Sequence, residues 1–120
     1  MRNYKELMIW KKGMEIAVNS FDMISFFPKE EKYSLSKQIT RAAISIPSNI
    51  AEGASRSSEK DYCRFLEIAL GSCYELETQY IIAQKANIGD KKRIEGNLAL
   101  LNEEQKMIGS LITKIKKANG

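Results

Sequence analysis

Residues 38–53 carry two opposite chemistries along what their spacing predicts to be a single helix. At about 100° of rotation per residue, apolar side chains fall on one side and short polar or charged side chains on the other. The apolar side comprises Leu35, Ile39, Ala43, Ile46 and Ile50, and the polar side comprises Arg41, Ser45, Ser48, Asn49, Glu52 and Arg56. A solvated helix face usually carries long Lys and Glu side chains, whereas these shorter groups suit close contact with each other, another helix or a ligand.

The same 3.6-residue periodicity predicts three further helices and little β structure. One precedes residues 38–53, is capped by Asn3 and ends at residues 26–28, and two follow, capped by Ser58 and Asp90. Their inward stripes are Leu7, Trp10, Met14, Ala17, Val18, Phe21 and Ile24; Tyr62, Phe65, Leu66, Ala69, Cys73, Leu76, Tyr80 and Ala83; and Ile94, Leu98, Leu101, Ile108, Ile112 and Ile115. Because short connections make neighbouring helices antiparallel, the chain predicts an all-α, up-down-up-down four-helix bundle that forms one domain over residues 1–120.

Pro47 lies inside the second predicted helix, which begins within residues 29–36 and ends near Ala54. A proline in a helix interior removes an amide donor, and its ring clashes with the carbonyl four residues earlier, at a cost of about 3 kcal/mol. Because the apolar stripe keeps its phase from Ile39 to Ile50, we expect a kinked helix rather than a broken one.

The composition disfavours most enzymes. The chain has no histidine, and this absence excludes Ser-His-Asp sites, Cys-His sites and the Glu-x-x-His di-iron arrangement of ferritin-like bundles. Cys63 and Cys73 would lie about 15 Å apart on one helix at 1.5 Å per residue, too far for a disulfide. We therefore expect no catalytic residue, cofactor or metal. With neither a signal peptide nor a membrane-spanning run, the chain is predicted to be cytoplasmic.

A second apolar face on the first helix predicts self-association. Ile9, Ile16 and Met23 repeat every seven residues on the far side of the helix from Leu7 and Met14. If these side chains were exposed, a monomer would carry a large apolar patch, which usually marks an interface. We expect these three residues to form an oligomer interface. The alternative is that wide apolar faces fill a broad core.

The polar side of residues 38–53 predicts a structural network formed by Arg41, Ser45, Asn49, Glu52 and, from the third helix, Glu77. Glu77 lies close to an apolar stripe, where an unpaired carboxylate would be costly. Arg41 is the first candidate for its partner. The alternative is that the group binds a ligand or performs catalysis.

Lys91, Lys92 and Arg93 open the fourth predicted helix, where positive charge opposes the helix dipole. Cations around a helix N-terminus attract phosphate, and Lys11 and Lys12 add basic surface if they lie nearby. The formal net charge of +4 permits a polyanionic partner but does not require one. We expect these five residues to contact the nucleic-acid backbone. The alternative is a solvated turn kept soluble by its lysines.

Several segments resemble a bacterial four-helix-bundle family. They are residues 38–53, then Tyr4, Leu7 and Trp10, and residues 27–31, 68–72 and 75–79. The family is best known from open reading frames within intervening sequences of 23S ribosomal RNA genes. It is also similar to the accessory variability protein of diversity-generating retroelements.

The resemblance implies a four-helix fold, and the retroelement protein implies a basic homopentamer that binds a reverse transcriptase and nucleic acid. We therefore expect a non-enzymatic, homo-oligomeric bundle, by resemblance a pentamer, that acts as an accessory protein on RNA or DNA. The alternative is a scaffold for a genomically linked protein, such as a reverse transcriptase. Many relatives have two adjacent basic residues where this chain has Thr40 and Arg41, which weakens a phosphate-binding role there.

Overall fold

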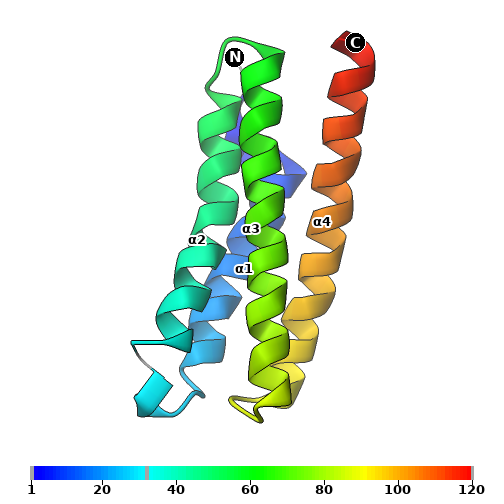
Figure 1. Ribbon diagram of the computed structural model, residues 1–120. Helices are drawn as coiled ribbons and strands as arrows, with labels where there is room; N and C mark the ends of the chain where they lie inside the picture. The colour runs from blue at the N-terminus through cyan, green and yellow to red at the C-terminus, as the bar shows by residue number, and fades with distance from the viewer. Residues whose placement is uncertain (1, 32, 120) are drawn as a thin grey trace.

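The computed structural model describes residues 2–31 and 33–119. Its four helices are α1 (Met8–Ile24), α2 (Leu35–Ala54), α3 (Glu59–Lys85) and α4 (Lys91–Asn119), with short 3-10 turns η1 (Tyr4–Glu6) and η2 (Lys29–Glu31). Consecutive helices run in opposite directions and lie side by side in an elongated bundle of 46 × 21 × 19 Å (Figure 1). The part of the chain that the structure describes contains no strand, and the predicted four-helix bundle is confirmed.

The helix ends follow the predicted capping residues, with one difference. Ser58 Oγ accepts a hydrogen bond from the Asp61 amide at 3.1 Å, and Asp90 Oδ2 accepts one from the Arg93 amide at 3.0 Å. Asn3 caps the turn η1 instead of α1, which begins only at Met8. The chain therefore makes an additional turn before entering the bundle.

Helix α2 passes through Pro47 without a break and ends at Ala54. Its apolar stripe is buried on both sides of the proline, with Ile39, Ile46 and Ile50 fully inaccessible. Burial of this stripe compensates for the backbone hydrogen bond that the proline removes. The helix is therefore not broken, as expected, and the bend at Pro47 stays a prediction.

Gly89, in the α3–α4 connection, is required by the fold. Its φ of +84° lies in the left-handed region, which other residues rarely adopt. A Cβ atom at this position would approach Phe27 Cε1 to 2.5 Å. The α3–α4 connection can therefore pack against Phe27 only because Gly89 has no side chain.

The core corrects the prediction for α1. Ile9, Ile16 and Met23, expected at an oligomer interface, are only 5%, 0% and 1% exposed, and they pack in the core of the chain's own bundle. Conversely, two residues of the predicted inward stripe, Val18 and Phe21, are 62% and 51% exposed. The alternative of a broad core filled by wide apolar faces is therefore correct for these three residues.

Small residues explain this difference. The buried side of α1 includes Gly13 and Ser20, which a count of large apolar side chains does not register. A Cβ atom on Gly13 would lie 3.0 Å from Glu104 Oε2 and 3.3 Å from Ile46 Cγ2. Gly13 thus allows α1 to approach α2 and α4 closely, and this approach determines which side of α1 faces the core.

Across residues 2–31 and 33–119, none of the helices combines the length and the apolar character that crossing a membrane requires. Cys63 and Cys73 are both free and buried, as their separation on one helix predicted.

Candidate functional site

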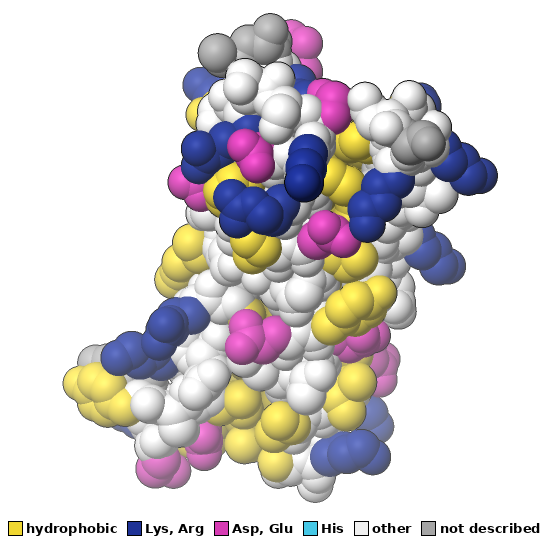
Figure 2. Space-filling view, turned by 45° about the horizontal axis from the view of Figure 1, so that its top comes forward, with side chains coloured by type: hydrophobic (Ala, Val, Ile, Leu, Met, Phe, Trp, Pro, Cys, Tyr) yellow, Lys and Arg dark blue, Asp and Glu magenta, His cyan; other side chains and the backbone are white. Residues whose placement is uncertain are grey.

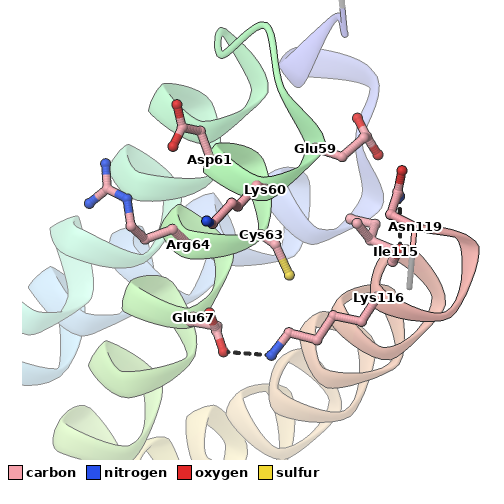
Figure 3. Close-up of a pocket in the computed structure, with 9 residues that line it drawn as sticks. All are labelled: Glu59, Lys60, Asp61, Cys63, Arg64, Glu67, Ile115, Lys116 and Asn119. Atoms are coloured by element: carbon pink, nitrogen blue, oxygen red, sulfur yellow. Dashed lines mark hydrogen bonds and ion pairs between the residues drawn. The ribbon is translucent and has the colours of Figure 1, made fainter.

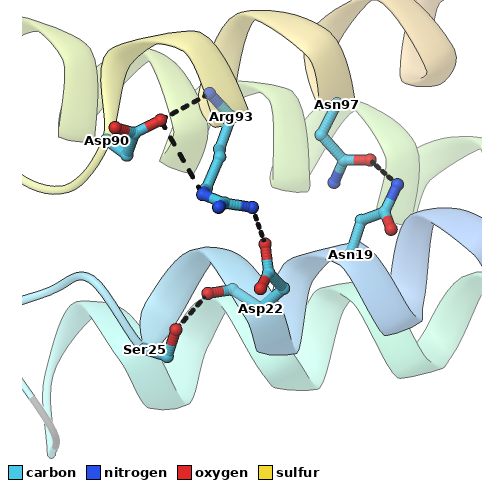
Figure 4. A network of polar contacts seen from close by, with 6 residues as sticks. All are labelled: Asn19, Asp22, Ser25, Asp90, Arg93 and Asn97. Carbon is cyan, nitrogen blue, oxygen red and sulfur yellow. Dashed lines mark hydrogen bonds and ion pairs between the residues drawn. The ribbon is translucent and has the colours of Figure 1, made fainter.

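The basic N-terminus of α4 is held against α1 by ion pairs (Figure 4). The Arg93 guanidinium donates to Asp22 Oδ2 at 2.7 Å and lies 3.9 Å from Asp90 Oδ2. Lys91 and Lys92 are exposed and form no ion pair within the described ranges. Of the three predicted phosphate contacts here, Arg93 therefore serves mainly to join α4 to α1, and the two lysines remain available.

Lys11 and Lys12 do not extend this basic cluster. Lys12 Nζ donates to Glu103 Oε2 at 2.8 Å, and this hydrogen bond raises the pKa of Lys12 and lowers that of Glu103. Glu103 lies about 16 Å along α4 from Lys92, at 1.5 Å per residue. Lys11 is exposed. The structure thus separates the five predicted residues into two regions, and it pairs one residue in each with a carboxylate.

A denser basic surface lies on the second half of α4, which we call the lysine-rich half, residues 105–119. This segment contains Lys106, Lys114, Lys116 and Lys117 and no Asp or Glu. All four side chains are exposed. Lysines near a helix C-terminus interact favourably with the helix dipole. This surface therefore carries its positive charge at the helix end where the dipole favours it. The predicted cluster at Lys91 carries positive charge at the end where the dipole opposes it.

A groove of about 770 Å³ separates the lysine-rich half from the first turns of α3 (Figure 3). Its floor includes the nearly buried Cys63 and Ile115, and its α3 rim includes Lys60 and Arg64. Lys116 crosses the groove and donates to Glu67 Oε2 at 3.1 Å.

Figure 2 shows Lys and Arg side chains gathered at this end of the bundle, with hydrophobic side chains between them. Glu59 and Asp61 also line the groove, so its rim has mixed charge. The strongest uninterrupted positive surface is therefore the lysine-rich half rather than the groove.

Part of the predicted polar network forms between α2 and α3. Ser45 Oγ and Ser72 Oγ share a hydrogen bond at 2.6 Å. Asn49 Nδ2 donates to Ser45 Oγ at 3.0 Å and to the Ser45 carbonyl at 2.8 Å. These contacts lie between two packed helices, and they support a structural role for Ser45 and Asn49.

The prediction that Arg41 pairs with Glu77 is wrong. Glu77 faces α4 and accepts a hydrogen bond from Gln105 Nε2 at 3.2 Å. Arg41 lies on the exposed side of α2 and forms no ion pair in the described part of the chain. Glu52 lies 3.7 Å from Arg56, one turn along the same helix. Four of the five predicted residues therefore make three separate sets of contacts, because they face different neighbours, and Arg41 joins none of them.

A buried hydrogen-bond cluster escaped the sequence analysis. Tyr80 of α3 contacts the hydroxyl of Ser20 on α1 and accepts a hydrogen bond from Asn97 on α4. Burial raises the pKa of Tyr80 to about 12. Ser20 and Asn97 also donate to the Ile16 carbonyl, at 2.8 and 3.3 Å. The cluster joins three helices, and the position of Asn97 in phase with Ile94 and Leu101 would have been the signal for it.

Glu104 is the second buried polar group that was missed. The residue is fully inaccessible, and neither carboxylate oxygen has a hydrogen-bond partner in the described chain. Burial raises its pKa to about 8. The predicted stripe of α4 jumps from Leu101 to Ile108, and Glu104 occupies the helical turn between them. The same gap in the stripe could have indicated it from the sequence.

An apolar surface groove of about 410 Å³ runs between α1 and α2. The residues that line it include Trp10, Met14, Val18, Phe21, Ile44 and Pro47. Met14, Val18, Phe21 and Ile44 are each more than a third exposed. The apolar patch that the sequence predicted on α1 therefore exists, but it lies on the opposite side of the helix.

No group of three or more His, Cys, Asp or Glu side chains that could hold a metal ion occurs among the described residues.

Comparisons with known proteins agree with this architecture. The model of the family described as "23S rRNA-intervening sequence protein" matches residues 5–110. A crystal structure from Bacteroides thetaiotaomicron, described as a protein with unknown function from the S23 ribosomal protein family, superposes with a TM-score of 0.81 and 28% identity. The match covers 88% of this chain and 98% of that one. No curated protein matched the chain. The chain belongs to the 23S rRNA-intervening sequence protein family.

Proposed function

We propose that the protein is a non-enzymatic, cytoplasmic accessory protein that assembles with copies of itself, as a pentamer, and binds the phosphate backbone of RNA or DNA. The observation that carries this proposal is the lysine-rich half of α4, a segment with four exposed lysines and no carboxylate of its own, in which Lys116 is paired with Glu67 of α3 and the other three lysines have no ion pair in the described structure. Lys60 and Arg64 lie across the neighbouring groove and extend the positive surface.

Assembly supplies the affinity that one copy lacks. A monomer with a formal charge of +4 attracts a polyanion weakly. Five linked copies carry a charge of about +20, and each additional contact becomes intramolecular once the first has formed. Affinity then depends on several phosphate contacts at once and falls steeply with salt.

Two exposed apolar surfaces on different sides of the bundle support self-association. One is the groove between α1 and α2, with Val18 and Phe21 on its edge. The other lies on α3, where the exposed Ile68 and Tyr74 flank Gly71, above which there is open space. Contact between unlike surfaces builds rings or filaments, whereas a two-fold dimer uses one surface twice. The pair of surfaces therefore favours a ring.

The second candidate function is a scaffold for a protein partner, such as a reverse transcriptase encoded nearby. The apolar groove between α1 and α2 favours it, because such grooves accept amphipathic helices. In this case the exposed lysines serve for solubility. The sequence-predicted residues Lys91, Lys92 and Lys11 remain secondary candidates for phosphate contacts under the first proposal.

Titration of labelled RNA and DNA duplexes at several salt concentrations tests the proposal. The main variant replaces Lys114 and Lys117 with Gln, and the matched control, which removes the same number of charges, replaces Lys91 and Lys92 with Gln. We expect weaker binding and a shallower salt dependence for the main variant, with a smaller change for the control. No binding at tens of micromolar, or equal binding by wild type and main variant, would favour the scaffold function.

A further inference from the structure

Glu104 occupies a position that an ionised carboxylate could hold only at a high cost. Its side chain is 0% exposed, and both carboxylate oxygens lack hydrogen-bond partners within residues 2–31 and 33–119. A Cβ atom on Gly13 of α1 would lie 3.0 Å from Glu104 Oε2, and Ile46 Cγ2 and Pro47 Cα of α2 lie 3.3 and 3.6 Å from the same point. An isolated charge in such surroundings loses its hydration without replacement. The geometry therefore favours the protonated carboxyl group.

The charged and titratable groups around Glu104 do not compensate a negative charge. From α1, Lys12 acts on it electrostatically, but the ammonium group is already bound to Glu103 at 2.8 Å and has Glu15 beside it. From α3 comes the Cys73 thiol, which burial keeps protonated by raising its pKa, and Glu77 lies near enough to act on the same thiol. The α2 atoms nearest a Cβ on Gly13, Ile46 Cγ2 and Pro47 Cα, are apolar. Ionisation must therefore be accommodated by movement or by water entry.

Helix α1 connects Glu104 to the apolar groove. Gly13 faces the carboxylate, and the adjacent Met14 lines the groove on the outer side of the same helix. Trp10, one turn earlier, lines the groove as well. Any displacement of α1 that makes room for a hydrated carboxylate at Gly13 must also move these two side chains. Helix α1 thus couples ionisation of Glu104 to the position of the Trp10 and Met14 side chains in the groove.

We propose that Glu104 is a proton-binding site that keeps the contact between α1 and α4 closed when protonated and opens it when ionised, so that the apolar groove is intact only in the protonated state. The link to assembly rests on the proposed self-association through this groove, whereas the proton site itself does not.

The direction of the pH effect follows from burial. Because the folded protein holds the proton more tightly than the unfolded chain, the contribution of Glu104 to the closed contact is complete at acidic pH. That contribution is lost as the pH rises through about 8, the pKa of the buried group. The closed contact therefore weakens on the alkaline side of neutrality.

Trp10 is the only tryptophan in the chain and lines the apolar groove between α1 and α2, so its emission reports displacement of α1. Its fluorescence is followed from pH 6 to pH 10 in wild type, in Glu104→Gln and in Glu95→Gln. Gln mimics the protonated carboxyl group in size, so the first variant should fold. Glu95 lies exposed on the same helix without a partner in the described chain, and it controls for the loss of one charge.

We expect an emission shift with a midpoint near pH 8 in wild type and in Glu95→Gln, and none in Glu104→Gln. Absence of the shift in wild type, or an unchanged shift in Glu104→Gln, would overturn the proposal. Light scattering on the same samples should show alkaline dissociation in wild type but not in Glu104→Gln.

A monomeric mass at every pH, together with the emission shift, would refute the assembly part and leave the proton site standing. An assembly that persists in wild type above the emission midpoint would refute the coupling between them. The failure of either proposal is therefore distinguishable from that of the other.

Discussion

Ser45 Oγ lies 2.6 Å from Ser72 Oγ, and this pair of hydroxyl groups joins α2 to α3 at a position where a solvated helix face would carry long charged side chains. Asn49 donates to the same Ser45 hydroxyl. The unusual polar side of residues 38–53 is thus explained in part by helix packing.

Removing this hydroxyl should destabilise the bundle. Ser45→Ala leaves the Ser72 hydroxyl without this partner and removes one of the two hydrogen bonds of Asn49, which typically costs about 1 kcal/mol. We expect a lower melting temperature by circular dichroism and unchanged binding of nucleic acid. Ser48→Ala, at an exposed position on the same helix, serves as the control. An unchanged melt with lost binding would instead identify a ligand site.

The hydroxyl of Tyr80 should matter more than that of an exposed tyrosine. Tyr80→Phe deprives Ser20 and Asn97 of their shared partner in the core but leaves both bonded to the Ile16 carbonyl, so we expect the loss typical of a buried hydrogen bond, roughly 0.5–1.5 kcal/mol. Tyr74→Phe, on the exposed side of the same helix, should have no measurable effect. Urea denaturation compares the two midpoints. Equal midpoints would show that the buried cluster contributes nothing to stability.

Two substitutions on α1 should separate assembly from folding. Val18→Glu places a charge on the exposed edge of the apolar groove, so we expect a smaller mass by light scattering with unchanged helicity. Ile16→Glu buries an unpaired charge in the core and should unfold the chain. A wild-type mass equal to that of one chain would refute the proposed assembly. Normal folding of Ile16→Glu would contradict the described position of α1.

Two glycines should respond oppositely to substitution by alanine. Gly89→Ala introduces a Cβ atom at a positive φ and against Phe27, and we expect a loss of more than about 1 kcal/mol. Gly96→Ala lies within α4 with nothing within 4 Å of the new Cβ atom, so it should gain up to about 1 kcal/mol. Thermal melts should show a lower melting temperature for Gly89→Ala and a higher one for Gly96→Ala than for wild type. Destabilisation by Gly96→Ala would indicate a close neighbour at this surface in the assembly.

Stability should depend on pH through Glu104. Its pKa is about 8 in the folded state and near 4.5 when the group is unperturbed, so wild type should lose stability progressively as the pH rises between these values. The loss should be on the order of a few kcal/mol. Glu104→Gln should lack this slope when urea midpoints are measured from pH 5 to pH 9. Parallel slopes in the two proteins would contradict a buried, protonated Glu104.

The sequence predicted α3 and α4 better than α1, for a physical reason. Large apolar residues such as Leu66, Leu76 and Leu101 supply the buried stripes of α3 and α4, so periodicity identifies the inward side. On α1, Gly13 and Ser20 share the inward side with Ile16, and their small size is what permits close helix contact. A count of apolar side chains therefore does not identify a helix face that is buried because its side chains are small.

The candidate site was harder to predict than the fold. Lys91 and Lys92 were identified from the helix dipole, but the carboxylate on α1 that would bind Arg93 depends on tertiary contacts, which one sequence does not reveal. Arg41 and Glu77 have complementary charges, yet they point to different neighbours. Glu104 was overlooked because a carboxylate in phase with an apolar stripe was treated as a gap in that stripe.

The lysine-rich half of α4 makes the two ends of the molecule chemically unlike. At one end stand Lys114, Lys116 and Lys117, whereas at the other Arg93 is paired with Asp22 and Asp90, and Lys91 and Lys92 stay without an ion pair among the described residues. In a ring whose axis runs along the helices, cyclic symmetry would place every lysine-rich end on the same side. Such a ring would have a front and a back: a polyanion would approach from one direction only, and the opposite side would be left open to a second kind of partner.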